Sequence, residues 1–547
     1  MRQVWRGDRR LVGLLLLGAI PAAVESAVLT GVGFRSAQGQ GPQVTAVWPY
    51  DVYHDLRWLL VYHDSWVTFG LEWVVMVLGR GLLSAGFVVL AWPREVPRPG
   101  VRDLAMRNLV LAAVASVILS PWAALNLAAG VVALSWYLFA SLIPLFLLAP
   151  FLQRAGAVSG WWRGLPSIEM VGWSLLNFAL ITAAGAAIWS VPAWLNVPVA
   201  AIAGAANGLL WQRVVCAAVL PRRTRWRRVP VAPVAVVLTL LAPLAVRAAT
   251  GAKTGTQGEW EVPVLNQPLP DSIDHAVIAL AGYDSVYDGA PAVDPDVERF
   301  SYLGIDERGR PRPYPAQATH GSLESSAALL DAQVRKLHER TRKPVALIGQ
   351  SQGAMVARLY LRMYPGSPVD TVMLFSPLVR AGRTYYPPAE ADSGWGLAAG
   401  WLIRGLFAVS NQVSKVKDDP DDGFVRSLLE EAPFWRNETL CPVWGVRMIA
   451  FIPTITAAEA PPLEYARIPV YQLPAFHGGL LGRPVVQDRI FSYLGGEELN
   501  RPTGEYTVLQ RLSAAWQAPP LFLSLNPAWA DNEGPDPART GRICQPR

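Results

Sequence analysis

The sequence predicts a chain in two parts, an α-helical transmembrane bundle followed by an α/β domain with a parallel sheet. Three observations predict this fold class. Residues 1–250 contain long apolar runs, whereas residues 271–497 alternate short apolar runs with patterns typical of helices. Residues 251–270 form a polar linker that contains glycine and proline. Hydrophobic residues make up 52% of the chain and charged residues only 16%, an average that hides a strong split, since residues 251–547 look like a soluble globular chain.

The first part is expected to cross the membrane about seven times, because one span needs about 20 apolar residues. The candidate spans are residues 11–30, 66–92, 109–129, 131–152, 168–190, 197–219 and 229–248. Arginines collect in alternate loops, at residues 2–10, 94–107, 154–163 and 222–228. By the positive-inside rule these loops are cytoplasmic. We therefore expect a cell-membrane protein with a cytoplasmic N-terminus and an extracytoplasmic second part.

Two features of the bundle have more than one interpretation. Residues 1–27 also resemble a signal peptide, whose cleavage would remove the first span without changing the sidedness of the rest. Glu72 and Arg80 lie inside the second span at a spacing that lets one bundle-facing side hold both. Such a pair is either structural or part of a path for an ion or a lipid, since ionisable groups in a membrane are functional candidates.

The loop before the second span, residues 34–65, repeats a Tyr-His-Asp triplet that contains His54 and His63. On a straight helix these histidines would point to opposite sides, so a shared metal site would need a break between them. We expect a polar loop at the membrane surface and no metal site. In the second part, Cys441 and Cys544 are compatible both with a disulfide and with two free thiols.

The chemistry is expected at Gly349-Gln350-Ser351-Gln352-Gly353, which follows an apolar run and precedes a helical pattern at residues 354–364. Strand, Gly-x-Ser-x-Gly and helix is the order that presents a nucleophilic serine on a sharp turn. Gly349 and Gly353 suit such an elbow, because side chains there would clash with the closely packed backbone. The expected strands are residues 275–281, 300–304, 344–349, 371–375, 446–452 and 468–473.

On these residues the chain resembles the α/β-hydrolase family over about 270–497. The resemblance implies a triad in the chain order serine, carboxylate, histidine, here Ser351, Glu459 and His477. Serine needs a neighbouring base to remove its proton, and the carboxylate orients the histidine that serves as that base. Many family members have Asp at the acid position, and Glu464 is an alternative to Glu459.

The rest of the site is expected to surround this triad. The oxyanion hole would use the backbone N–H groups of Gln352, directly after the nucleophile, and of Tyr283, in the loop after the first strand. His320 lies in the loop after the second strand, at the edge of the site. Residues 378–440 contain an apolar helix, at residues 396–413, and form either a cap or a structural insertion.

These expectations describe a membrane-anchored serine hydrolase that cuts esters, in particular lipid-like acyl esters, and needs no cofactor. A thioesterase, a peptidase and an acyltransferase use the same fold. The alternative from another class is a transporter or receptor whose hydrolase-like domain only binds a ligand. The net charge of +6 comes largely from arginines beside spans, so no nucleic acid is expected. The expected partners are the bilayer and a small-molecule or lipid ester substrate. The sequence does not predict the oligomeric state. The tail, residues 498–547, indicates no function.

Overall fold

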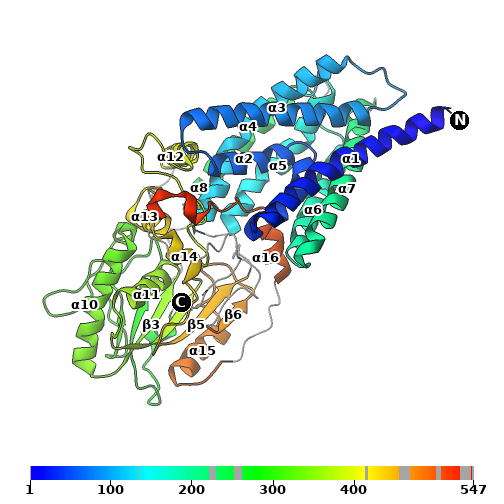
Figure 1. Cartoon of the computed structure of the whole chain (residues 1–547). Helices are drawn as coiled ribbons and strands as arrows, with labels where there is room; N and C mark the ends of the chain where they lie inside the picture. Colours follow the sequence, from blue (N-terminus) through cyan, green and yellow to red (C-terminus); the bar gives the residue numbers. More distant parts are fainter. Residues whose placement is uncertain are drawn as a thin grey trace.

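The computed structural model describes residues 2–132, 135–220, 229–251, 262–412, 417–454, 468–499, 507–529 and 544. A bundle of helices lies against a sheet domain, and the cap and the end of the chain lie between the two (Figure 1). The predicted fold class is confirmed, since apolar helices come first and a parallel α/β domain follows.

The long helices of the bundle follow the predicted spans. They are α1 (Arg2–Gly31), α3 (Trp66–Ala91), α4 (Val101–Val132), α5 (Ser135–Ala157), α6 (Ile168–Ile188), α7 (Asn196–Val219, preceded by η2, Ala193–Leu195) and α8 (Val231–Gly251). Among the described residues, five are long and apolar enough to cross a membrane, namely α1, α3, α4, α6 and α7. Helices α5 and α8, with 23 and 21 residues, lie where the fourth and seventh spans are expected. The number of spans therefore stays a prediction.

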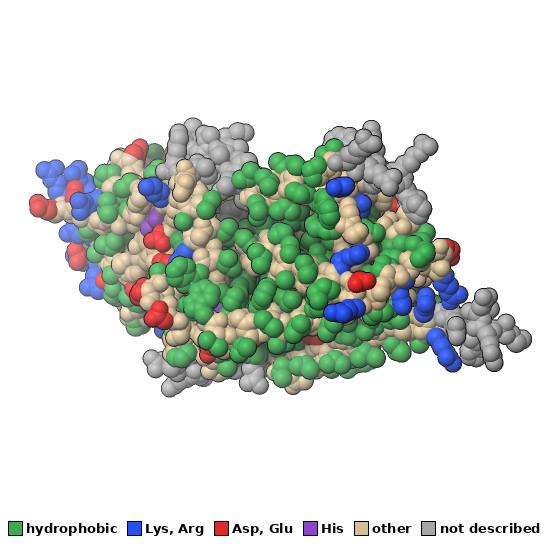
Figure 2. Space-filling model, turned by 90° about the horizontal axis from the view of Figure 1, so that it is seen from above, with side chains coloured by type: hydrophobic (Ala, Val, Ile, Leu, Met, Phe, Trp, Pro, Cys, Tyr) green, Lys and Arg blue, Asp and Glu red, His purple; other side chains and the backbone are tan. Residues whose placement is uncertain are grey.

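Apolar side chains cover the outside of this bundle. In Figure 2 they fill the middle of the visible face, and Lys and Arg gather toward its ends. Along α1 they recur at helical spacing at Leu16, Ile20 and Val24, each more than half exposed. Exposed apolar surface of this extent is typical of helices that face lipid.

The loop expected at the membrane surface is instead buried inside the bundle. It forms η1 (Arg35–Thr45) and α2 (Tyr50–Val61), whose residues are almost all buried. The backbone N–H of Val47 donates to Asn177 of α6 (3.0 Å), and Asn207 of α7 donates to the carbonyl of Pro42 (2.9 Å). The expectation of a surface loop is wrong because these polar groups find partners on neighbouring helices rather than in water.

The charged residues of the bundle pair differently from the prediction. His54 contacts Glu25 of α1 (2.9 Å) and its neighbour Asp55 (2.8 Å). Arg80 is buried and pairs with Asp55, whereas Glu72 is exposed on the outer side of α3. The predicted common side for Glu72 and Arg80 is therefore wrong, because α2 supplies the carboxylate that Arg80 needs.

The second part is a sheet of parallel strands covered on both faces. The strands are β1 (Ala276–Leu280), β2 (Val297–Arg299), β3 (Val345–Gln350), β4 (Val369–Phe375), β5 (Arg447–Pro453) and β6 (Val470–Leu473), in the order β2-β1-β3-β4-β5-β6. Helices α10 (Leu323–Thr341) and α11 (Gln352–Met363) pack on the face that contains Ile278; α15 (Pro484–Leu494) and the short α9 (Pro263–Asn266) pack on the face of Val277. The strand expected at residues 300–304 is misplaced, since β2 precedes it directly.

The carboxyl edge of the sheet faces the bundle. A few residues after β4, the N–H of Gly382 donates to the carbonyl of Val131 (2.8 Å), and the Thr384 hydroxyl donates to Leu127 (2.9 Å). Both acceptors lie at the carboxyl end of α4. The insertion then forms α12 (Leu397–Ser410), α13 (Gly423–Glu430) and α14 (Ala432–Asn437) before β5 begins. Ligands of parallel α/β sheets bind at this edge, so the bundle borders the expected site.

Helix α12 is fixed to the bundle at its first turn. His63 donates from Nδ1 to the carbonyl of Leu59 and accepts at Nε2 from the N–H of Ala398, both at 2.7 Å. The ring of Trp401, which is 54% exposed, lies 6.3 Å from that of Trp66 at the start of α3. One side of α12 therefore continues the apolar surface of the bundle.

The end of the chain returns to the bundle. After α16 (Thr507–Ala514), an extended segment reaches between the helices before the short turns η6 (Leu523–Leu525) and η7 (Pro527–Trp529). Trp516 is 1% exposed and stacks on Phe178 of α6, with ring centroids 4.8 Å apart. Its carbonyl accepts from Arg57 (2.7 Å) and Asn126 (3.0 Å). The tail thus fills an opening between the helices that is lined by polar side chains such as Arg57 and Asn126.

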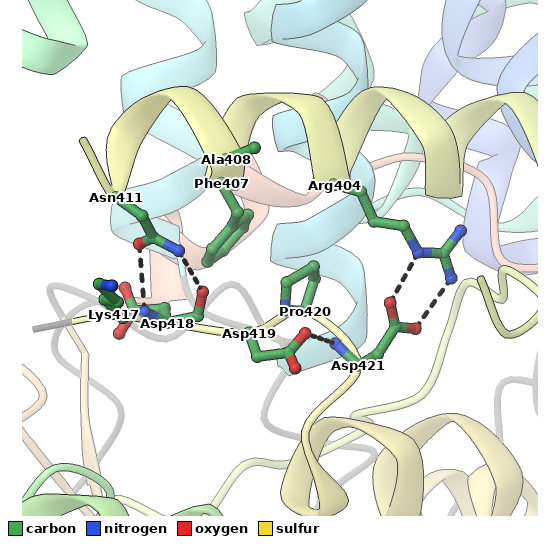
Figure 3. A pocket seen from close by; sticks show the side chains of 9 residues that line it. All are labelled: Arg404, Phe407, Ala408, Asn411, Lys417, Asp418, Asp419, Pro420 and Asp421. Carbon is green, nitrogen blue, oxygen red and sulfur yellow. Dashed lines mark hydrogen bonds and ion pairs between the residues drawn. The ribbon is translucent and has the colours of Figure 1, made fainter.

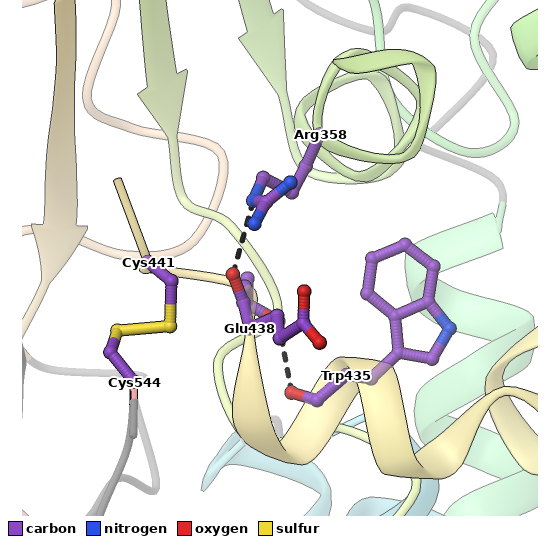
Figure 4. The surroundings of a disulfide bond; sticks show 6 residues. Arg358, Trp435, Glu438, Cys441 and Cys544 are labelled. Atoms are coloured by element: carbon purple, nitrogen blue, oxygen red, sulfur yellow. Dashed lines mark hydrogen bonds between the residues drawn. A yellow bond between two sulfur atoms is a disulfide. The ribbon is translucent and has the colours of Figure 1, made fainter. Parts of the chain in front are cut away.

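A disulfide links this tail to the end of the cap. Cys441 and Cys544 are bonded, with Cα atoms 5.1 Å apart. In Figure 4 the bond lies beside α14, next to Glu438, whose carbonyl accepts from Arg358 of α11 (3.0 Å). Of the two alternatives that the sequence leaves open for these cysteines, the structure has the disulfide.

Candidate active site

Ser351 lies on the turn between β3 and α11 in a strained backbone conformation, with φ 54°. Its N–H donates to the carbonyl of Phe375 at the end of β4 (2.8 Å). A Cβ on Gly349 would lie 2.6 Å from the carbonyl oxygen of Gly353, and one on Gly353 would lie 2.4 Å from that of Leu280. The two glycines therefore allow the backbone to pack closely around the turn. This packing holds Ser351 in its strained conformation and presents its side chain.

His477 is placed as a base for this serine. Its Nε2 lies 2.8 Å from Ser351 Oγ, although the two residues are 126 positions apart. The Ser376 hydroxyl, at the end of β4, donates to the His477 carbonyl (2.5 Å) and fixes the loop after β6. Burial lowers the pKa of His477 to about 4, so the imidazole is neutral and can accept the serine proton near pH 7.

The predicted acid lies outside the described residues. Glu459 and Glu464 both belong to residues 455–467, between β5 and β6. Of the described ends of this loop, Thr454 directly follows β5 at the carboxyl edge, and Ile468 leads into β6 at the opposite edge. The identity of the triad acid stays a prediction.

The loop predicted to complete the oxyanion hole lies against the nucleophile. A Cβ on Gly282 would lie 3.1 Å from Ser351 Cβ and 3.6 Å from its Oγ, so glycine admits the close approach. Tyr283 follows Gly282 directly, and Gln352 is buried at the start of α11. The structure thus brings together Ser351, His477, Gln352 and Tyr283, while their catalytic roles stay predictions.

A polar cluster beside this loop was only partly predicted. The Tyr283 hydroxyl donates to Asp422 of the cap (2.5 Å), and its ring stacks on that of His320, with centroids 4.5 Å apart. His320 Nε2 lies 2.8 Å from Asp284. The sequence placed His320 at the site edge, but it did not single out Asp422, one of four aspartates around Pro420. An aspartate directly before a helix is the signal that marks it as an N-cap.

A separate hollow lies under α12, away from Ser351 and His477. It has a volume of 380 Å³ and is lined by Arg404, Phe407, Ala408, Asn411, Lys417, Asp418, Asp419, Pro420 and Asp421 (Figure 3). Arg404 makes a bidentate pair with Asp421 (2.6 and 2.8 Å), and Asn411 bonds the backbone of Asp418. These pairs join α12 to the loop that leads to Asp422. No group of His, Cys, Asp or Glu in the described part of the chain has the arrangement of a metal site.

Comparison with known proteins identifies the second part. Residues 297–458 match the family model described as serine aminopeptidase, S33 (Hydrolase_4). The match covers β2 to the loop after β5, including Ser351 and the cap, and it ends before Glu459 and His477. The predicted resemblance to α/β-hydrolases is therefore confirmed for the C-terminal region. Neither a curated protein nor a solved structure matches the chain.

Proposed function

We propose that this protein is a membrane-anchored serine hydrolase that cleaves lipid-like acyl esters on the extracytoplasmic side of the membrane. The observation that carries the proposal is the 2.8 Å contact between Ser351 Oγ and His477 Nε2 at a strained strand-to-helix turn. A serine presented in this way, next to a neutral imidazole, is the arrangement of an activated nucleophile.

In the proposed reaction His477 Nε2 accepts the proton of Ser351 as Oγ forms a bond with the ester carbonyl carbon. The oxyanion that develops accepts hydrogen bonds from the backbone N–H groups of Gln352 and Tyr283. His477 then protonates the leaving alcohol as its bond to the carbonyl carbon breaks. Water repeats the steps on the acyl-serine and releases the acid. Glu459 is proposed to orient the imidazole.

The position of the site supports a substrate drawn from the membrane. The carboxyl edge of the sheet faces the bundle through the contacts of Gly382 and Thr384 with α4. The exposed Trp401 on the cap lies next to Trp66 at the end of a lipid-facing helix. An acyl chain that leaves the bilayer at this end has an apolar surface to follow.

Two observations support the extracytoplasmic side. The arginine-rich loops alternate along the sequence, which by the positive-inside rule leaves the sheet domain outside. The Cys441–Cys544 disulfide is of the kind that persists in oxidising compartments.

A peptidase is the second candidate, favoured by the description of the matching family as serine aminopeptidase. The transporter or receptor alternative rests on ionisable groups inside the bundle, of which Arg80 is buried against Asp55, whereas Glu72 is exposed on the outer side of α3. Thioester hydrolysis and acyl transfer use the same Ser351 chemistry, and the choice among them depends on the substrate.

The test uses the full chain in lipid nanodiscs with two substrates, p-nitrophenyl octanoate and alanine p-nitroanilide. We expect ester turnover and labelling by a fluorophosphonate probe, both abolished by Ser351→Ala. Ser492→Ala, at a partly buried serine of α15 rather than in the elbow, is the matched control. Turnover of the anilide alone would favour the peptidase, and labelling that survives Ser351→Ala would refute the proposed nucleophile.

A further inference from the structure

The two residues proposed to bind the oxyanion share one support, the short turn η4 (Ala316–His320). The side-chain amide of Gln352 donates to the carbonyl of Thr319 (2.5 Å). The hydroxyl of the same Thr319 accepts from the N–H of Asp284 (3.0 Å), the residue after Tyr283. Thr319 is fully buried, so it connects both sides of the oxyanion hole in a place that water does not reach.

Asp284 is held in a conformation that a free loop would not keep. Its φ is 59°, in the left-handed region that most side chains avoid. The contact with Thr319 and the pair with His320 Nε2 (2.8 Å) stabilise it there. The direction of the Tyr283 backbone therefore depends on groups outside its own loop.

Tyr283 is fixed through its side chain as well. Its ring lies between His320, nearly parallel at 12°, and Phe424 of α13, whose centroid is 5.3 Å away. Its hydroxyl donates to Asp422 Oδ2 (2.5 Å). Burial, reinforced by the negative charge of Asp422, raises the pKa of Tyr283, so the phenol stays protonated and remains a donor.

Asp422 links this support to the cap. It is the N-cap of α13, where Oδ1 accepts from the N–H of Val425 (2.8 Å). Its other oxygen accepts from Tyr283, and its side chain is only 6% exposed. Next to it, Asp421 pairs with Arg404 of α12 (Figure 3). A continuous series of contacts thus runs from the membrane-facing α12 to the loop beside Ser351.

We infer that Asp422 is a positioning residue: through the Tyr283 hydroxyl, the seated cap holds the Tyr283 backbone N–H in line with the oxyanion. This inference rests on the proposed function and deepens it. If the cap moves away from the sheet domain, Asp422 separates from Tyr283. The Tyr283 backbone N–H, the second donor of the oxyanion hole, is then no longer aligned. Ser351 and His477 keep their own contact, since neither touches the cap aspartates in the structure.

The test compares Tyr283→Phe and Asp422→Ser with their double variant, as purified full chains in nanodiscs acting on p-nitrophenyl octanoate. Phe keeps the stacked ring and removes only the hydroxyl. Ser keeps an oxygen to cap α13 and removes the acceptor of Tyr283. Tyr287→Phe is the matched control, because Tyr287 lies in the same loop but donates to the carbonyl of Ala290 (3.1 Å).

We expect each single variant to lower kcat about tenfold with KM unchanged, because an oxyanion donor acts in the transition state and its full loss costs about 100-fold or more. Both variants break the Tyr283–Asp422 hydrogen bond, and Asp422→Ser also removes the longer contact of Asp422 with His320 Nδ1 (3.7 Å), so the double variant should be no slower than Asp422→Ser alone. Tyr287→Phe should keep the parent kcat. Melting temperatures within a few degrees of the parent show that the variants fold, and if Asp422→Ser does not fold, Tyr283→Phe alone decides.

Three results would overturn the inference: an unchanged kcat in Tyr283→Phe, losses that multiply in the double variant, or a change confined to KM. A parent protein without turnover on the ester or the anilide refutes the proposed function instead. If only the anilide is turned over, the same variants and the same criteria apply to that substrate.

Discussion

Arg57→Met should release the tail from the bundle. Arg57 is fully buried on α2 and donates to the carbonyls of Trp516 (2.7 Å) and Gln517 (3.0 Å). A methionine fills much of the same volume but donates nothing. The change therefore removes the contacts of the charged group to the tail, together with its hydrogen bonds to Gln43 Oε1 of η1 and to the carbonyl of Tyr53.

The magnitude follows from the contacts that remain. A hydrogen bond from a charged group contributes about 1.5–3 kcal/mol, so two lost bonds give about 3–6 kcal/mol. The lower end applies, because each carbonyl keeps a second donor: Asn126 for Trp516 (3.0 Å) and Gln40 for Gln517 (2.8 Å). We expect the docking of the tail to weaken by about 3 kcal/mol, about a hundredfold in its equilibrium.

Hydrogen exchange on the full chain in nanodiscs measures this directly. The N–H groups of Trp516 and Leu521, bonded to carbonyls of Ser513 and Arg383, should exchange about a hundredfold faster in Arg57→Met. Arg35→Met, at an exposed position of η1, should leave them unchanged. Equal exchange in Arg57→Met and the parent would show that the buried arginine does not hold the tail.

Three further predictions concern the site and the cap. The acid limb of kcat/KM should have its midpoint below pH 6.5, because His477 must be neutral to accept a proton and burial lowers its pKa; a pH–rate profile with its midpoint at 6.5 or above would contradict this. Gly353→Ala places a Cβ 2.4 Å from a backbone oxygen and should lower the free energy of unfolding of the domain by about 3 kcal/mol, as measured by chemical unfolding. Gly482→Ala, where the added Cβ has no atom within 4 Å, should change the free energy of unfolding by less than about 0.5 kcal/mol. His63→Phe leaves the N–H of Ala398 without its acceptor and should weaken the first turn of α12 by about 1–2 kcal/mol; unchanged exchange at that turn would refute the capping role.

The sequence predicts the elements whose signals are local. The apolar runs and helical periods around Ser351 lie within a few residues of each other, so they predict β3, the elbow and α11 in order. His477 was predicted because the chain has few histidines and only one follows the last strand. The structure places its Nε2 2.8 Å from Ser351 Oγ, while its catalytic role stays a prediction.

The sequence does not reveal contacts between distant polar segments. Residues 34–61 look like a surface loop because glutamine, glycine and charged residues usually face water. Their partners lie far along the chain: Gln43 donates to the carbonyl of Ala515, 472 positions away. The contact between Asp422 and Tyr283 could not be predicted for the same reason. The two residues are 139 positions apart, and they meet only because the cap folds over the sheet.

The tail also gives the assembly of this protein an order in time. A ribosome makes the bundle before residues 515–522, so Gln43 and Arg57 lack these partners while the sheet domain is synthesised. The contacts of the tail can therefore form only after residues 515–522 have been made, and the disulfide only after Cys544 has been made. A product that stops before residue 515 would leave Gln43 and Arg57 in the bundle without these acceptors, so the last steps of folding decide whether the polar groups of the bundle are satisfied.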